Sequence, residues 1–239
     1  MDGSLEEALV AIDVTNGLPA PHTTLDPWLI ALSPARLRSA KYAYTTRYVA
    51  ESIAQQPHGY FLLAAPDTRP QSGDVVLAEV VEIGHQRRLE SPLSRRAQMF
   101  VGDEIVVAYG DRYAPDQYEA EVPDSLEEAH LVAAGGVVGL MTAIREGLDE
   151  PTIVRPLGLL CDGQGAMSLS RVAPKALLPP LDLLAPRTAP RPPVVALVGT
   201  SMNSGKTTAL SSLSLGLTRS GMRVAAGKAT GTGAGGDPG

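Results

Sequence analysis

The residues best suited to chemistry lie in one stretch, GTSMNSGKTT, which runs from Gly199 to Thr208. Glycines, a lysine and hydroxyl residues in this order are typical of a loop whose main-chain N–H groups surround a phosphate at the start of a helix. Gly205 leaves the backbone without a Cβ where the phosphate approaches. We expect Lys206, as the catalytic residue, to neutralise the β- and γ-phosphates, and Thr207 to offer its hydroxyl to Mg²⁺.

Such a loop must lie between a strand and a helix. Residues 194–198 form a continuous apolar run, which is typical of a strand buried on both faces of a parallel sheet. The pattern predicts a helix from about Gly205 to a glycine cap at Gly221, and then a second strand over residues 222–226. The residues predicted to contact ATP or GTP are Gly199, Thr200, Ser201, Met202, Asn203, Ser204, Gly205, Lys206, Thr207 and Thr208.

The loop also resembles that of a known family. With five residues between Gly199 and Gly205, it resembles the phosphate loop of the dethiobiotin synthetase-like (SIMIBI) branch of P-loop NTPases, which typically reads GTDTxVGKT. In that branch the second strand is followed by a Lys-Pro-x-x-Thr/Ser-Gly stretch, and Lys228 and Thr230 stand in the corresponding stretch here. The resemblance implies that these two residues face an unknown small-molecule substrate. We carry over the nucleotide site and not biotin synthesis.

Residues 194–239 hold one predicted helix and two predicted strands, too few to cover both faces of a parallel sheet. We therefore expect the start (β-α-β) of a truncated α/β P-loop domain, within a fragment of a longer protein. The parent protein is predicted to be a Mg²⁺-dependent ATPase, or an ATP-dependent ligase or kinase. Asp237 is open to two interpretations, a ligand of Mg²⁺ or substrate and a solvated acidic residue.

The elements before the loop predict an α+β N-terminal domain that contains a small antiparallel β-barrel. Within residues 1–72, Ser33 suits a helix N-cap and Pro34 the first helical position, so one helix is expected over residues 33–56. Seven prolines make residues 174–193 a stiff linker between this domain and the P-loop domain.

Residues 73–173 are predicted to be the strand-rich, barrel-like part, with one helix and a hairpin over residues 155–172. Residues 130–147 fit a short strand, a Gly-Gly turn and a helix from about Val137. The other interpretation is one continuous helix, which a capping-box pattern at residues 124–128 would start. We prefer the strand, turn and helix, because each glycine inside a helix costs about 1 kcal/mol relative to alanine. Alternating apolar residues predict strands at 73–84, 96–102, 103–110 and 117–122.

Composition narrows the class of protein. The chain has 239 residues, of which 44% are hydrophobic, and a formal net charge of −6, so nucleic acid is not expected as a general partner. Cys161 is the only cysteine, which fits a cytoplasmic location. The first residues do not resemble a signal peptide, and no stretch approaches the roughly 20 apolar residues that span a bilayer, so no membrane partner is expected.

Three further groups of residues could take part in binding or in packing. Tyr109, Tyr113 and Tyr118 suit core packing, a homodimer contact or a ligand surface equally well. Four arginines that flank a turn form either a patch for RNA or a phosphate ligand, or an ordinary solvated hairpin. The alternative to an ATP-dependent enzyme is therefore a non-catalytic nucleotide-gated or RNA-binding module that works through the barrel. These arginines are Arg87, Arg88, Arg95 and Arg96. The four histidines do not have the spacing of metal ligands; they are His22, His58, His85 and His130.

Overall fold

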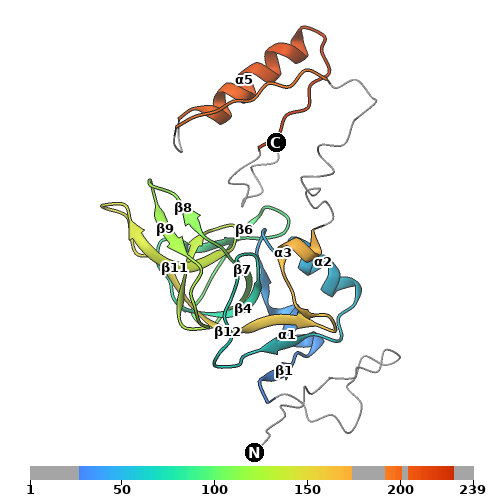
Figure 1. Ribbon diagram of the computed structural model, residues 1–239, viewed down its shortest axis with the longest axis vertical. Coiled ribbons are helices and arrows are strands. Elements are labelled where there is room, and N and C mark those ends of the chain that lie inside the picture. The colour runs from blue at the N-terminus through green and yellow to red at the C-terminus, as the bar shows by residue number, and fades with distance from the viewer. Residues whose placement is uncertain (1–26, 174–191, 201–203, 229–239) are drawn as a thin grey trace, which may run out of the picture.

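Most of the regular structure of this chain is β-sheet, with few helices (Figure 1). The computed structural model describes residues 27–173, 192–200 and 204–228. The predicted linker therefore lies outside the described residues, except for Pro192 and Pro193. Residues 201–203 of the predicted loop, Thr230 and Asp237 also lie outside them. The elements are β1 (Leu29–Ala31), α1 (Pro34–Ser39), β2 (Lys41–Tyr42), α2 (Arg47–Gln55), β3 (Phe61–Leu63), β4 (Val75–Glu82), β5 (Arg88–Glu90), β6 (Arg96–Gln98), β7 (Glu104–Tyr109), β8 (Arg112–Tyr113), β9 (Tyr118–Glu121), β10 (Ala129–Ala133), β11 (Val137–Ile144), β12 (Thr152–Asp162), β13 (Gly165–Ala166), α3 (Leu169–Val172) and α5 (Lys206–Arg219).

Five strands of the described chain pair in a closed ring. β4 lies antiparallel between β7 and β12, and β7 pairs in parallel with β11. β11 then pairs with β10, and β10 pairs with β12, which completes the ring. The strands predicted at 73–84, 103–110 and 117–122 are confirmed as β4, β7 and β9, while the strand predicted at 96–102 is confirmed only over β6.

Residues 27–72 add strands to the same sheet. β1 pairs with β3 and β3 pairs with β12, while β2 pairs in parallel with β7. The N-cap prediction is confirmed, because the Ser33 hydroxyl accepts a hydrogen bond from the Arg36 amide at 3.2 Å. The single helix over 33–56 is wrong in its middle, since pairing of β2 with β7 divides it into α1 and α2. At that break the buried Thr46 hydroxyl donates to the carbonyl of Val106, at 2.9 Å.

The helix predicted from Val137 is also wrong, because β11 occupies these residues. Val137 and Val138 pair with β7 and later residues pair with β9, so hydrogen bonds to distant strands replace those of a helix. Residues 124–128 are likewise not helical. The preceding strand and glycine turn are confirmed as β10 and a reversal at Gly136, whose φ of +99° suits glycine. The hairpin over 155–172 is confirmed as β12 and β13, but it ends in the short helix α3.

The core has two layers that share β4 and β7. Val76, Ala78 and Val80 of β4 point into the ring, where they pack with residues of β7, β10, β11 and β12. Val75 and Leu77 point the other way and pack with residues of α1 and α2. Because both faces of β4 are covered, its first four residues are all buried and apolar.

The described residues from 192 onward contain one regular element, α5. Its end is confirmed as predicted: Gly221 has a φ of +89°, its amide donates to Thr218, and the next amide donates to Leu217, which is a Schellman motif. The strands predicted at 194–198 and 222–226 are not formed. Val194 and Val198 are 84% and 90% exposed, and a parallel strand is stable only when both of its faces are covered.

The described residues include no helix with the length and apolar character that a membrane crossing requires.

Candidate functional site

The first turn of α5 carries the main features of the predicted phosphate loop. Gly205 is the N-cap, in the left-handed conformation with a φ of +82°, which a glycine adopts without strain. It has no side chain to cap the helix, and the first turn contains no acidic residue. The first amides of a helix have no partner within the helix and carry its partial positive charge. This end of α5 is therefore suited to an anion.

The two ends of the loop lie against each other. A Cβ added to Gly199 would be 2.8 Å from Cγ and 2.9 Å from Cδ of Lys206, and it would overlap Oγ of Ser204. The Lys206 ammonium donates a hydrogen bond to the Ser204 hydroxyl at 3.1 Å. The Lys206 stem therefore packs against Gly199, and a side chain at position 199 would require the Lys206 and Ser204 side chains to shift.

The remaining predicted site residues are less closely tied together. Thr200, Thr207 and Thr208 are exposed, and the Thr207 carbonyl accepts a hydrogen bond from the Ser211 hydroxyl at 3.0 Å. Lys228 is also exposed. Ser201, Met202, Asn203 and Thr230 lie outside the described residues. The structure therefore brings together Gly199, Ser204, Gly205 and Lys206, and it leaves the substrate role of Lys228 as a prediction.

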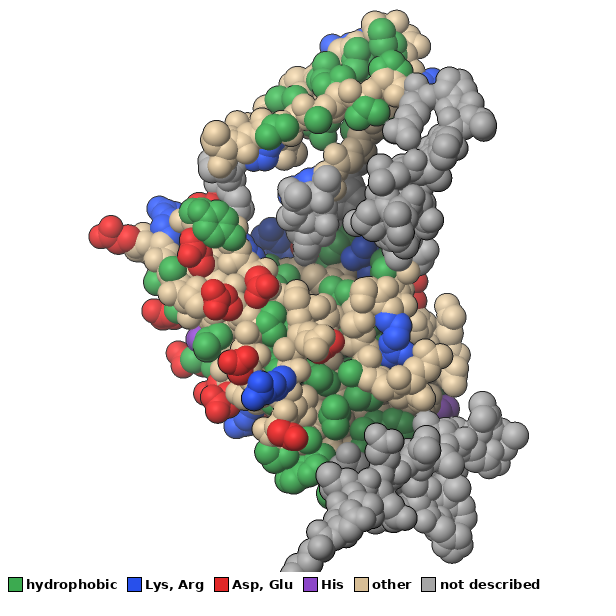
Figure 2. All heavy atoms as spheres, viewed as in Figure 1, with side chains coloured by type: hydrophobic (Ala, Val, Ile, Leu, Met, Phe, Trp, Pro, Cys, Tyr) green, Lys and Arg blue, Asp and Glu red, His purple; other side chains and the backbone are tan. Residues whose placement is uncertain are grey.

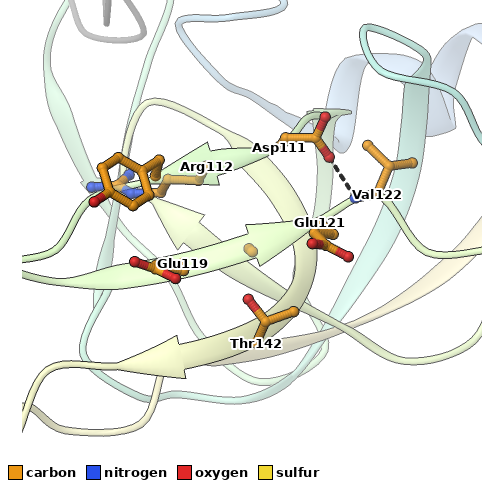
Figure 3. Close-up of a pocket in the computed structure, with 8 residues that line it drawn as sticks. Asp111, Arg112, Glu119, Glu121, Val122 and Thr142 are labelled. Atoms are coloured by element: carbon orange, nitrogen blue, oxygen red, sulfur yellow. Dashed lines mark hydrogen bonds between the residues drawn. The ribbon is translucent and has the colours of Figure 1, made fainter.

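A second feature is an open hollow of about 570 Å³ beside β8, β9 and β11 (Figure 3). Glu119 and Glu121 of β9 line it, two residues apart and so on one face of the strand. Asp111 lines it too, and its carboxylate accepts a hydrogen bond from the Val122 amide at 2.9 Å. Burial lowers the pKa of Arg112, although nearby Asp116 acts in the opposite direction. Across the described residues, no three His, Cys, Asp or Glu side chains are grouped to hold a metal ion.

The hollow was not expected from the sequence. The sequence shows that Glu119 and Glu121 are two residues apart. It does not show that they line the same hollow as Asp111 and Thr142, because this depends on the pairing of β9 with β8 and β11. Tyr113, one of the three tyrosines that the sequence suggests for a ligand surface, lines the hollow and is 76% exposed.

The three tyrosines of this region have separate roles. Tyr109 and Tyr118 are core residues, with 2% and 0% of their surface exposed, and burial raises the pKa of both phenols. The Tyr118 hydroxyl donates to the carbonyl of Asp149. Core packing therefore accounts for these two tyrosines, whereas Tyr113 remains on the surface.

Comparison with known proteins identifies no relative: no family model, curated protein or solved structure matches this chain.

Proposed function

We propose that residues 199–208 bind the phosphates of ATP or GTP. The main observation behind this proposal is that the aliphatic part of the Lys206 side chain packs against Gly199. The contact lies at the start of a helix that has no side-chain cap and no acidic residue in its first turn. Main-chain amides and a lysine that converge on one point form a site for a phosphate group. Lys206 would neutralise charge that develops on a transferred phosphate, which is the catalytic role proposed for it.

Mg²⁺ is the cation that we propose to accompany the nucleotide. This cation prefers oxygen ligands and keeps several waters, so it needs few protein groups when phosphate oxygens are also bound. The exposed hydroxyl of Thr207, in the first turn of α5, is the donor proposed here. When bound, the ion would supply positive charge to the phosphate oxygens.

We further infer that the ring of β4, β7, β11, β10 and β12 is a small β-barrel, because each of its strands has a partner on both sides. In an ATPase, or in an ATP-dependent ligase or kinase, this barrel would supply substrate recognition, regulation or dimerisation. Lys228 and Thr230 are proposed to face the small-molecule substrate. The alternative is a nucleotide-gated module without catalysis, in which the barrel is the working part.

A binding titration of the full chain with a fluorescent ATP analogue and Mg²⁺ tests the proposal. Lys206→Ala removes a charge-assisted contact worth about 1.5–3 kcal/mol, so affinity is expected to fall about 10- to 100-fold. Arg219→Ala, which removes one positive charge at the opposite end of α5, is the matched control and should retain affinity. Equal affinity in the wild type and Lys206→Ala, or no binding by the wild type, would overturn the proposal.

A further inference from the structure

The hairpin of β5 and β6 carries four exposed arginines on an anchored support. Leu89 and Met99 are each 1% exposed and pack into the core, which fixes the inner face of the hairpin. On the outer face Arg88 lies opposite Gln98, and Arg96 lies opposite Glu90. Arg88 and Arg96 are thus diagonal neighbours across the strand pair, close enough for two long side chains to reach the same ligand. The four arginines are Arg87, Arg88, Arg95 and Arg96.

The four hairpin arginines have no carboxylate partner within the described residues, in contrast to three arginines elsewhere in the chain. Within the described residues, none of the four guanidinium groups forms an ion pair or a side-chain hydrogen bond, so their donors face solvent. Elsewhere three arginines are each held by an acidic side chain. The three pairs are Arg36–Glu104, Arg155–Glu79 and Arg171–Asp162.

Charge is unevenly distributed between two segments of the described chain. Residues 111–150 contain ten acidic residues and two arginines, a net charge of −8, whereas residues 87–96 contain four arginines and one glutamate, a net charge of +3. Figure 2 shows acidic side chains gathered on the flank that carries β8, β9 and β11 in Figure 1. The net charge of −6, which disfavours nucleic acid as a general partner, therefore conceals a local positive surface.

An exposed aromatic ring lies next to this surface. Phe100 follows β6 and is 63% exposed. The Lys41 ammonium lies 5.3 Å from the centre of its ring and donates to the carbonyl of Gln98 at 3.0 Å, although Asp103 also pairs with it. Stacking of bases on aromatic rings, combined with cations that follow the backbone, is how proteins bind single strands.

We propose that the β5–β6 hairpin and Phe100 form a binding surface for single-stranded nucleic acid, with the arginines on its phosphates and a base stacked on Phe100. The four cations are all arginine, whose planar fork pairs with a phosphate through two N–H groups and stacks on bases. An anionic membrane binds lysine as well as arginine. The presence of arginine alone among these four cations therefore favours nucleic acid over a membrane. This surface acts independently of the phosphate loop.

Fluorescence anisotropy with a labelled oligouridine of about 20 nucleotides tests the surface on the full chain, between about 50 mM and 200 mM salt. Each phosphate contact contributes about −0.7 to the slope of log affinity against log salt for single strands. Arg88→Gln/Arg96→Gln should therefore weaken binding and make the slope shallower by about 1.4. Phe100→Ala should weaken binding without changing the slope.

The matched control is Arg38→Gln/Arg145→Gln, which removes two exposed arginines from other parts of the surface. It should bind as the wild type does. The proposal fails if the wild type does not bind the oligonucleotide at low salt, or if the hairpin variant and the control lose the same affinity. It also fails if the hairpin arginines are needed only for binding to phosphatidylserine vesicles, which would assign the surface to a membrane.

Discussion

Gly199→Ala is the substitution that most directly disturbs the proposed phosphate loop without removing a charge or a hydrogen-bonding group. Its new Cβ would lie 2.8 Å from Cγ and 2.9 Å from Cδ of Lys206, where carbon atoms normally stay about 3.5–4.0 Å apart. It would also overlap the Ser204 hydroxyl oxygen. Because these two carbons lie in the middle of the lysine stem, they have to move by about 1 Å, and the ammonium group moves with them.

Displacement of the ammonium would weaken its proposed contact with phosphate, a charge-assisted interaction worth about 1.5–3 kcal/mol. The dissociation constant for ATP with Mg²⁺, measured by isothermal titration calorimetry, should therefore rise about 10- to 100-fold. The far end of the same helix provides the control. Gly216 lies inside α5, and a Cβ added there would meet no other residue within 4 Å apart from the backbone of its own helix, so Gly216→Ala should leave ATP affinity unchanged.

Gly216→Ala should at the same time stabilise α5 by up to about 1 kcal/mol, because alanine is the better helix former. Circular dichroism shows whether both variants are folded. A folded Gly199→Ala variant that binds ATP as tightly as the wild type would refute the contact between Gly199 and Lys206 as a requirement for binding.

Two further predictions concern stability. Gly136→Ala should lower the free energy of unfolding in urea by about 3–5 kcal/mol, because its Cβ would collide with Ala43 and lie 2.8 Å from the Thr45 hydroxyl at a φ of +99°. Gly147→Ala, with a φ of +79° and open space, should lose only about 1–2 kcal/mol, and equal losses would contradict the collision. Burial raises the pKa of Cys161 from 9.0 to about 11. Ionisation of the thiol in the unfolded chain should therefore lower stability as the pH rises from 9 to 11, by at most about 3 kcal/mol. Cys161→Ala should show a correspondingly smaller loss over this range, and an identical pH dependence in both proteins would disprove the shift.

Local sequence patterns predicted those features that depend on neighbouring residues. Ser33 and Pro34 marked the start of α1, and Gly221 marked the end of α5, because helix caps involve residues only a few positions apart. Short apolar segments bounded by Gly, Asp and Pro likewise located β4, β7 and β9.

Features that depend on distant partners were not predictable in this way. Val137 was expected in a helix and lies in β11, because its backbone pairs with β7. The break between α1 and α2 similarly depends on pairing of β2 with β7. At the proposed phosphate loop, the residue types suggested phosphate binding, but only the three-dimensional structure shows the contact between Gly199 and Lys206. The hollow lined by Asp111 and Glu119 required the register of three strands.

The central claim is that main-chain amides at the start of α5 bind phosphate, and backbone amide chemical shifts report on it directly. On addition of ATP with Mg²⁺ to the full chain, the amides of Gly205, Lys206, Thr207 and Thr208 should show the largest changes. Shifts confined to other regions, such as the hollow beside β9 or the β5–β6 hairpin, with none at these four amides, would contradict the claim.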